Sequence, residues 1–492
     1  MKKILVANRG EIAIRIMRSA REMGIATVAV FSAADRLALH VQYADEAVYI
    51  GEAASNLSYL SIENIINACK ATHADAVHPG YGFLSENPTF AKALQEAGIK
   101  LIGPSSEAME IMGNKLSAKE AALRYNIPMI KGTKKPIRDI EEAKVQAEEI
   151  GFPILIKAAA GGGGKGMRIV KTQSEFKEEL KSAISEAKSA FGDDSVFLER
   201  YIASPKHIEI QVLADEHGNV IHLFERECSI QRRHQKVIEE APSPTLDAKI
   251  REEMGACAIN VARSCNYVGA GTVEFIMDSD HNFYFLEMNT RLQVEHPITE
   301  MITGVDLVKE QIKIARGEVL ALRQEDLSIH GHAIELRIYA EDPANNFFPD
   351  SGILKTYKLP EGPGVRVDNA YEAGMEISVY YDPMIAKLVV WAATREEAIQ
   401  RMKRAIDEYQ ITGIESTLAF GKFVMDHPVF QKGSYTTNFV DSYFNTRTIS
   451  PNNEEEAKVA AIIASHIFSK ELHETLTEPK TVSSNWKRNR VN

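Results

Sequence analysis

The chain has 492 residues, of which 45% are hydrophobic and 25% are charged, and its formal net charge is -11. This length suits about two to four domains. The composition is typical of globular proteins and excludes a disordered, collagen-like or disulfide-rich chain. The negative charge repels nucleic-acid phosphates and anionic lipids, so neither is an expected partner.

The four cysteines form no Cys-x-x-Cys pair, so we expect neither a disulfide framework nor a thiolate zinc site. No apolar stretch reaches the length of a membrane span. Arg9 and Glu11 interrupt the first apolar run before the core of a signal peptide could form. These features predict a protein of the reducing cytoplasm.

The first 100 residues alternate between short apolar runs and amphipathic segments. Strands are predicted at residues 3–7, 26–31 and 74–77, with helices at 11–23 and 62–68. This order predicts a doubly wound parallel sheet. The first turn between strand and helix lacks Gly-x-Gly-x-x-Gly, which argues against a dinucleotide-dependent redox enzyme.

The rest of the chain mixes strands and helices in a different order. Strands are expected at 154–157, at about 168–170 and near 201 with a helix between the last two, then at 208–213 and 220–224, and in a hairpin formed by 272–277 and 283–288. A strand at 388–392 and a helix at 395–408 follow, and one helix is expected in the polar segment beyond residue 445. The predicted fold class is therefore multidomain, with α/β and α+β parts.

Four consecutive glycines, at 161–164, lie between two predicted strands. The run fits neither the Rossmann nor the Walker spacing, because a strand follows it. Each glycine costs roughly 0.5 to 1 kcal/mol relative to alanine, so such a run needs a reason. One reading is a mobile flap that closes over phosphates, and the other is a flexible surface loop. Lys157, in an apolar strand before the loop, would be neutralised by such a phosphate, whereas Lys115 alone resembles an ordinary exposed lysine.

Two acids interrupt the apolar strands of the predicted hairpin. Glu274 and Glu287 stand on its two arms, and Asn289 shares the face of Glu287. Such an oxygen-rich cluster suits Mg²⁺ together with nucleotide phosphates. The alternative is that both acids are solvated.

A further polar cluster follows the hairpin. In an extended chain Arg291, Gln293 and Glu295 point to one side, so that a cation, an amide and a base converge. This set suits an oxyanion substrate that must lose a proton. The basic run at 231–236 either joins that site or forms a solvated loop.

Five motifs together carry a family resemblance: ILVANRGEIA at 4–13, HPGYGFLSEN at 78–87, the glycine loop at 160–167, QRRHQK at 231–236 and EMNTRLQVEHPIT at 287–299. Over residues 1–445 the chain resembles the biotin carboxylases of the ATP-grasp superfamily. The resemblance implies an ADP-forming carbon–nitrogen ligase that carboxylates biotin with bicarbonate through carboxyphosphate. It implies a Rossmann-like domain at 1–114, an ATP-grasp domain at 115–330 with a lid at about 130–203, and a mixed α+β domain at 331–445. The tail at 446–492 either docks a partner or is disordered.

The resemblance also assigns roles by position. It implies nucleotide contacts for Lys115, Lys157, Gly163, Gly164, Glu199, Arg200, Tyr201, Ile202, His207, Gln231, His234, Glu274 and Glu287. Metal ligation is implied for Glu274, Glu287 and Asn289, and bicarbonate or biotin contacts for Lys236, Arg291, Gln293, Val294, Glu295, Arg337, Tyr81 and Gly82. The catalytic set is Glu295 as general base, Lys236 and Arg291 as cations beside bicarbonate, and Arg337 as the cation beside the biotin enolate.

The expected cofactors are ATP and two Mg²⁺ or Mn²⁺ ions. No Ala-Met-Lys-Met biotinylation sequence occurs, so biotin is expected on a separate biotin carboxyl carrier protein, and a carboxyltransferase is likewise expected on another chain. The resemblance alone implies that the carboxylase is a homodimer. The resemblance most often implies acetyl-CoA as acceptor, in fatty acid biosynthesis. Propionyl-CoA and pyruvate stay open, as do a different ATP-grasp ligase and a non-catalytic protein that senses nucleotides.

Overall fold

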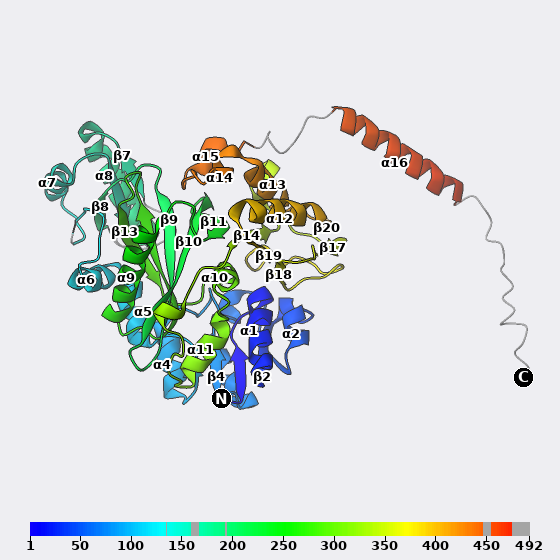
Figure 1. Ribbon diagram of the computed structural model, residues 1–492, viewed down its shortest axis with the longest axis horizontal. Coiled ribbons are helices and arrows are strands. Elements are labelled where there is room, and N and C mark those ends of the chain that lie inside the picture. The colour runs from blue at the N-terminus through cyan, green and yellow to red at the C-terminus, as the bar shows by residue number, and fades with distance from the viewer. Residues whose placement is uncertain (134, 159–166, 192–193, 446–453, 475–492) are drawn as a thin grey trace, which may run out of the picture. The chain divides into compact units, whose positions relative to one another are not determined.

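The computed structural model describes residues 1–133, 135–158, 167–191, 194–445 and 454–474. The chain divides into two compact units, Met1–Phe444 and Asn445–Asn492 (Figure 1). The predicted glycine loop, with Gly163 and Gly164, lies outside the described residues.

The N-terminal part is a five-stranded parallel sheet of order β3-β2-β1-β4-β5, which confirms the predicted doubly wound domain. Its strands are β1 (Lys3–Val6), β2 (Ala26–Ser32), β3 (Glu46–Gly51), β4 (Ala76–His78) and β5 (Lys100–Leu101), and its helices are α1 (Gly10–Glu22), α2 (Leu39–Tyr43), α3 (Ile62–Thr72) and α4 (Pro88–Glu96). Ile4 and Val6 belong to the hydrophobic cluster of α1, and Leu5 to that of α3 and α4. The alternation along β1 thus places helices on both faces.

A second, three-stranded sheet has the order β7-β6-β8. The central strand β6 (Ile154–Ala158) pairs antiparallel with β7 (Arg168–Val170) and with β8 (Val196–Arg200). Helices α7 (Ile140–Ile150) and α8 (Gln173–Phe191) share a hydrophobic cluster with these strands. Its described elements β6, β7, α8 and β8 follow the predicted order of strand, strand, helix and strand.

The largest sheet has eight strands in the order β13-β12-β9-β10-β11-β14-β19-β18, and its neighbouring strands pair antiparallel. The strands are β9 (Lys206–Ala214), β10 (Val220–Arg232), β11 (Gln235–Ala241), β12 (Gly269–Met277), β13 (Phe283–Asn289), β14 (His332–Tyr339), β18 (Val365–Asn369) and β19 (Met384–Ala392). The predicted hairpin of β12 and β13 is confirmed. Strand β11 precedes residue 330 and pairs with β14, which follows it. The sheet therefore contains strands from both sides of the domain boundary that the sequence resemblance places at residue 330.

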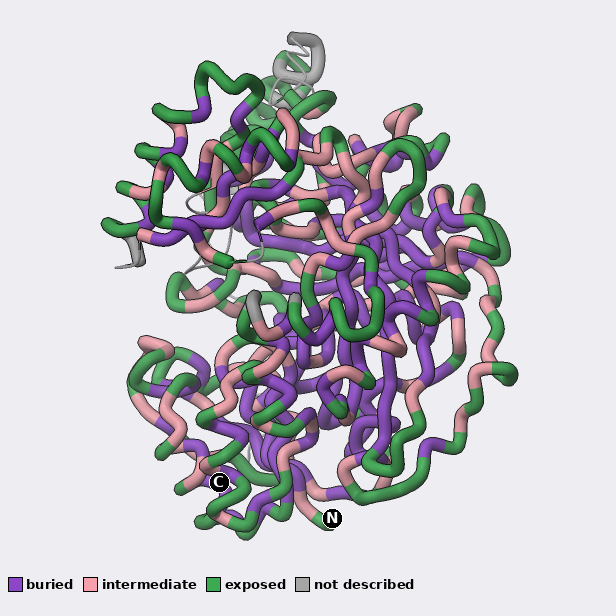
Figure 2. Tube along the Cα trace, turned by 90° about the vertical axis from the view of Figure 1, so that its left-hand side faces the viewer, coloured by how far each residue is buried: buried purple, intermediate pink, exposed green. Residues whose placement is uncertain are grey.

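Helices cover this sheet and join it to the N-terminal part. Helix α10 (His296–Thr303) packs on β14, β10, β11 and β19, and α11 (Leu307–Ala315) packs on α1. The other elements of the larger unit are α5 (Ser106–Gly113), α6 (Lys115–Arg124), α9 (Ala248–Ser264), α12 (Arg395–Glu408), α13 (Leu418–Asp426), α14 (Pro428–Gln431), α15 (Phe439–Tyr443), β15 (Glu341–Asp342), β16 (Phe348–Pro349), β17 (Thr356–Lys358) and β20 (Gln410–Thr412), besides short 3-10 turns. Buried residues follow the interior strands, and exposed residues follow the outer loops (Figure 2).

The second unit contains helix α16 (Glu454–Glu474), the one helix expected beyond residue 445. Among the described residues, no helix has both the length and the apolar character that a membrane crossing requires.

Candidate active site

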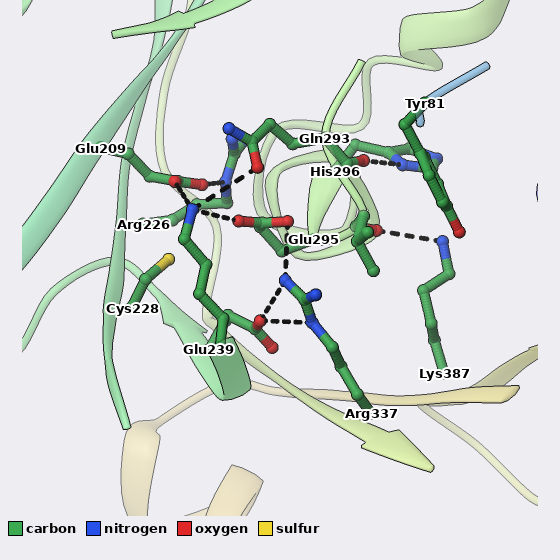
Figure 3. A network of polar contacts seen from close by, with 12 residues as sticks. Tyr81, Glu209, Arg226, Cys228, Glu239, Gln293, Glu295, His296, Arg337 and Lys387 are labelled. Atoms are coloured by element: carbon green, nitrogen blue, oxygen red, sulfur yellow. Dashed lines mark hydrogen bonds and ion pairs between the residues drawn. The ribbon is translucent and has the colours of Figure 1, made fainter. Parts of the chain in front are cut away.

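The candidate site lies on one face of the eight-stranded sheet, beneath the loop at 290–295 that joins β13 to α10 (Figure 3). Strand β11 contributes Lys236, β14 contributes Arg337, and the loop contributes Glu295. Pairing of β11 with β14 brings the two cations to the same region, although about 100 residues separate them in the sequence. Three of the four predicted catalytic side chains, Lys236, Glu295 and Arg337, therefore meet where the sheet crosses from the central to the C-terminal part.

Glu295 is fully buried between these two cations. Its Oε1 accepts a hydrogen bond from Lys236 Nζ at 2.7 Å, and its Oε2 accepts one from Arg337 Nη2 at 3.1 Å. Burial alone would raise the pKa of the carboxyl, but the charges of Lys236, Arg337 and Arg226 outweigh it and lower the pKa. Glu295 is consequently ionised at neutral pH and is able to accept a proton.

Arg337 is held by a second carboxylate that the sequence analysis did not single out. Its Nε donates to Glu239 Oε1 at 2.7 Å, and Glu239 is fully buried on β11. Burial raises the pKa of Glu239 to about 7 although Arg337 lowers it, and the charge of Glu295 raises it further. The guanidinium thus bridges two acids, which fixes its plane against the sheet.

Lys236 lies at the centre of the cluster. Its ammonium contacts Glu209 Oε2 at 2.5 Å and Glu274 Oε1 at 2.9 Å, and a long contact of 3.5 Å reaches Gln293 Oε1. Glu209, on β9, also accepts a hydrogen bond from Arg226, whose guanidinium is fully buried. Sequence reasoning missed both Glu209 and Arg226. Glu209 interrupts an apolar run between Ile208 and Ile210, but Arg226 stands between two other charged residues, which gives it no distinct local signal.

Two of the three predicted metal ligands are register partners, Glu274 on β12 and Glu287 on β13. Glu274 accepts hydrogen bonds from Asn289 at 2.9 Å and Gln293 at 3.0 Å, and His207 Nε2 lies 3.1 Å from its Oε2. Burial opposes the ionisation of Glu274, but Lys236 and His207 lower its pKa well below the ordinary value. Glu287 is exposed to solvent, but the protein around its carboxyl partly removes water from it. This desolvation and the charge of Glu274 raise the pKa of Glu287.

These oxygens fit a divalent cation. Among the described residues, ligand atoms of His207, Glu209 and Glu274 lie within 4.8 Å of one another. Lys236 already neutralises Glu209 and Glu274 on that side. Glu287 is the register partner of Glu274, and Asn289 contributes an amide oxygen that accepts from Arg291. Carboxylate and amide oxygens are ligands of the kind that Mg²⁺ prefers. Desolvation and then the charge of Glu274 raise the pKa of Glu287, and a cation there would offset the repulsion between the two acids.

The loop that carries Glu295 is fastened by the N-terminal domain. The backbone N–H of Thr290 donates to Glu86 Oε1 at 3.1 Å, and Arg291 Nε donates to Glu86 Oε2 at 2.9 Å. Arg291 also donates to Asn289 Oδ1 at 3.0 Å. Glu86 belongs to the motif at 78–87, but sequence reasoning assigned it no role.

The remaining predicted residues are spread around this centre. Lys157, for which the sequence suggests a phosphate partner, pairs with Glu199 Oε2 across β6 and β8 at 2.5 Å. Gln231 donates to the carbonyl of Cys228 within β10, and Tyr81 donates to Glu11. Arg200 and His234 are exposed, Tyr201 and Ile202 are half-buried after β8, Gly82 has φ +69°, and Lys115 begins α6 with a side chain outside the described set.

Family profiles match most of the chain. The N-terminal domain of biotin carboxylase matches residues 1–109, the ATP binding domain of the carbamoyl-phosphate synthase L chain matches 114–323, and the biotin carboxylase C-terminal domain matches 335–442.

Individual proteins agree with the profiles. Biotin carboxylase 1 of Bacillus subtilis is 53% identical over 444 residues, covering 90% of this chain and 99% of that protein. A pyruvate carboxylase subunit from Methanothermobacter thermautotrophicus is 54% identical over 441 residues, covering 90% of each chain. A structure of the biotin carboxylase domain dimer of 2-oxoglutarate carboxylase from Hydrogenobacter thermophilus, with ADP, its magnesium salt and bicarbonate, has a TM-score of 0.85 at 47% identity and covers 90% of this chain and 98% of that one. The chain therefore belongs to the biotin carboxylase family and is an ATP-dependent biotin carboxylase.

Proposed function

We propose that the chain catalyses the first half-reaction of a multisubunit carboxylase, in which biotin on a separate carrier protein is carboxylated at the expense of ATP and bicarbonate. The observation that carries the proposal is the buried, ionised Glu295 held between Lys236 and Arg337. A base flanked by two cations suits a substrate that is an anion and must still lose a proton.

In the first step, bicarbonate binds beside Lys236 and Arg291 and gives its proton to Glu295. These cations hold the charge that grows on the substrate oxygens. When the Lys236 ammonium also contacts bicarbonate, it stabilises the charged form of Glu295 less. The pKa of Glu295 therefore rises as the substrate binds, and the carboxylate becomes a stronger base. The bicarbonate oxygen then attacks the γ-phosphate of ATP, which releases ADP and leaves carboxyphosphate.

In the second step, carboxyphosphate breaks down to CO2 and phosphate. The ureido N–H of biotin is a very weak acid, and phosphate accepts its proton while Arg337 stabilises the enolate oxygen. The nitrogen then bonds to CO2. Because Glu239 already orients Arg337, the guanidinium is in place before biotin arrives.

Nucleotide and metal are assigned to neighbouring groups. Glu274, Glu287 and Asn289 would hold Mg²⁺ or Mn²⁺, which neutralises the phosphates when bound. For the nucleotide we propose the lid residues Lys157, Gly163, Gly164, Glu199, Arg200, Tyr201 and Ile202, with Lys115, His207, Gln231 and His234 around them. The same reading proposes domains at 1–114, 115–330 and 331–445.

The partners follow from the half-reaction. We propose a biotin carboxyl carrier protein, a carboxyltransferase, a homodimeric carboxylase and a cytoplasmic location. The match covers 99% of the length of Biotin carboxylase 1, so that relative has no room for a further carrier domain. This supports a carboxylase chain that is separate from its carrier protein. The dimer of the Hydrogenobacter thermophilus domain supports the homodimer.

For the acceptor we propose acetyl-CoA, which would place the enzyme in fatty acid biosynthesis. Pyruvate is the second candidate, since the Methanothermobacter thermautotrophicus pyruvate carboxylase protein is 54% identical, against 53% for Biotin carboxylase 1. Incorporation of radiolabelled bicarbonate by the native complex, isolated through a tag on this chain, distinguishes acetyl-CoA, propionyl-CoA and pyruvate. Incorporation of label only when pyruvate is the acceptor supplied, and so only in its carboxylated product, would overturn the acetyl-CoA assignment.

The half-reaction itself is tested by ADP release from the purified chain with Mg-ATP. We expect free biotin at high concentration to stimulate release only when bicarbonate is present. Absence of stimulation by both free biotin and a biotinylated carrier, in folded protein, would contradict the proposal.

A further inference from the structure

A buried lysine outside the catalytic set contacts the loop that carries Glu295. Lys387, on β19, is fully buried, and its ammonium donates to the carbonyl oxygen of Val294 at 3.0 Å. Figure 3 shows Lys387 to the right of Glu295, whereas Glu239 lies on the left-hand side. The proposed chemistry assigns no role to Lys387. Its ammonium contacts a backbone carbonyl and not a proposed substrate position.

Two carboxylates neutralise this ammonium. Glu11 Oε2 of α1 lies 3.2 Å away and Asp368 Oδ2 of β18 lies 3.7 Å away. Asp368 is shared with Arg366 at 2.8 Å, so Glu11 is the acid whose charge Lys387 mainly balances. A buried ammonium is costly without such partners. Burial raises the pKa of Glu11 to about 7 although Lys387 lowers it.

Glu11 extends the contact to the segment expected near biotin. Its other oxygen, Oε1, accepts a hydrogen bond from the hydroxyl of Tyr81. Tyr81, Glu11, Lys387 and the Val294 carbonyl therefore form one continuous polar chain from the N-terminal domain to the loop. The four groups come from the loop after β4, from α1, from β19 and from the loop before α10.

The loop backbone between Gln293 and Glu295 has a second fixed point. His296 Nδ1 lies 2.8 Å from the carbonyl of Gln293, and because a carbonyl only accepts, the ring nitrogen is the donor. Successive carbonyls are thus held by His296 and by Lys387. Their peptide planes set the directions in which the side chains of Gln293 and Glu295 leave the backbone.

We propose that Lys387 is a positioning residue, which orients Glu295 through the Val294 carbonyl and links that orientation to Tyr81 through Glu11. The inference rests on the proposed function, since it assigns to Glu295 and Tyr81 their roles toward bicarbonate and biotin. A displacement of a catalytic group by about 1 Å lowers a rate by about 100-fold. A purely structural lysine would instead affect folding alone.

The test compares Lys387→Met with the double variant Glu11→Gln/Lys387→Met. The single variant leaves the buried Glu11 carboxyl without its cation, so the group either stays charged without a partner or takes up a proton, and we expect both the melting temperature and the kcat to fall. The double variant replaces that carboxyl by a neutral amide, so its melting temperature should recover. Because the Val294 carbonyl still lacks its hydrogen bond from Lys387, the kcat of the double variant for biotin-dependent ADP release should stay about 100-fold below that of the wild type. Its KM for ATP should be unchanged.

Recovery of kcat together with melting temperature in the double variant would overturn the positioning role. Lys422→Met is the matched control, since Lys422 forms an exposed pair with Asp407 on the surface and should leave both quantities unchanged.

Hydrogen exchange gives a readout that does not depend on activity. In both variants the amides of residues 292–296 should exchange faster than in the wild type, while those of β1 should not change. Unchanged exchange in this loop would also overturn the inference. If the wild type lacked biotin-dependent ADP release but the loop still loosened, the proposed function would fail while the structural link stood.

Discussion

At the scale of single residues, the candidate site is a set of buried charges that stabilise one another. Lys236 contacts three carboxylates, those of Glu209, Glu274 and Glu295. Arg337 contacts two, and one of these is again Glu295. Such a cluster tolerates burial only because each charge has an opposite neighbour, and removal of one member leaves the others uncompensated.

Substitutions of Glu295 and of Arg337 should have different effects on ATP hydrolysis and on biotin carboxylation. Arg337→Ala removes the cation beside the biotin enolate, so biotin carboxylation should fall by about 100-fold or more, while bicarbonate-dependent ATP hydrolysis falls much less. Glu295→Ala removes the base of the first step and should depress both activities. Parallel assays of ADP release and carboxybiotin formation measure the ratio. Equal losses in Arg337→Ala would contradict the enolate role.

At the scale of elements, β11 is the strand that joins the central part to the C-terminal part. Its Glu240 accepts hydrogen bonds from His332 of β14 at 2.6 Å and from Arg395 of α12 at 2.7 Å, and also from Tyr435. Burial would raise the pKa of Glu240, but His332 and Arg395 lower it to about 2. The ionised form therefore stabilises the docking of α12 on the sheet.

This contact predicts a pH-dependent stability. The folded pKa of about 2 lies below the ordinary 4.5, so the stabilisation is complete above pH 4.5 and is lost as the pH falls toward 2. It amounts to about 3 kcal/mol. Urea unfolding should show Glu240→Gln less stable than the wild type at about pH 6, with the difference shrinking at about pH 3.5. Glu408→Gln, which breaks an exposed pair with Arg404, is the control and should show little difference at either pH. A gap that is constant with pH would contradict the assignment.

At the scale of the whole molecule, the chain consists of the carboxylase unit and a second unit around α16. That helix exposes apolar side chains: Val459, Ile462, Ile463, Ile467 and Phe468 are each more than half exposed. The profile matches end at residue 442, before this helix. An exposed apolar helix favours docking of a partner protein over a purely solvated tail.

Deletion of residues 450–492 should accordingly weaken assembly with the carrier and carboxyltransferase and leave free-biotin turnover unchanged. Size-exclusion chromatography of the reconstituted complex and the ADP-release assay measure the two effects. A matched substitution of Val459, Ile463 and Ile467 by serine should reproduce the loss. Assembly that is unaffected by both changes would sink the docking hypothesis.

Local patterns in the sequence determined part of the order of elements and part of the central polar groups. Strands β1, β2 and β4 with helices α1 and α3, and the hairpin around residues 278–282, follow from short-range periodicity, which depends on the side chains of one element. Strand β3 of the first sheet and strands β11 and β14 beneath the site were not predicted. The glutamates of the hairpin and Glu295 with its neighbours could be named in the same way, because they interrupt an apolar run or share one side of an extended segment. Lys236, which lies in the motif at 231–236, and Arg337, which lies outside the five motifs, take their roles from the family resemblance.

Only the tertiary structure decided which charges neutralise one another. Lys157 forms an ion pair with Glu199, Arg337 with Glu239, and Lys387 with Glu11. These partners lie on different strands and helices, so no local pattern relates them. A charge inside an apolar run can be read from the sequence, but its partner is set by strand pairing and helix packing, and that partner determines whether the charge is stable when buried.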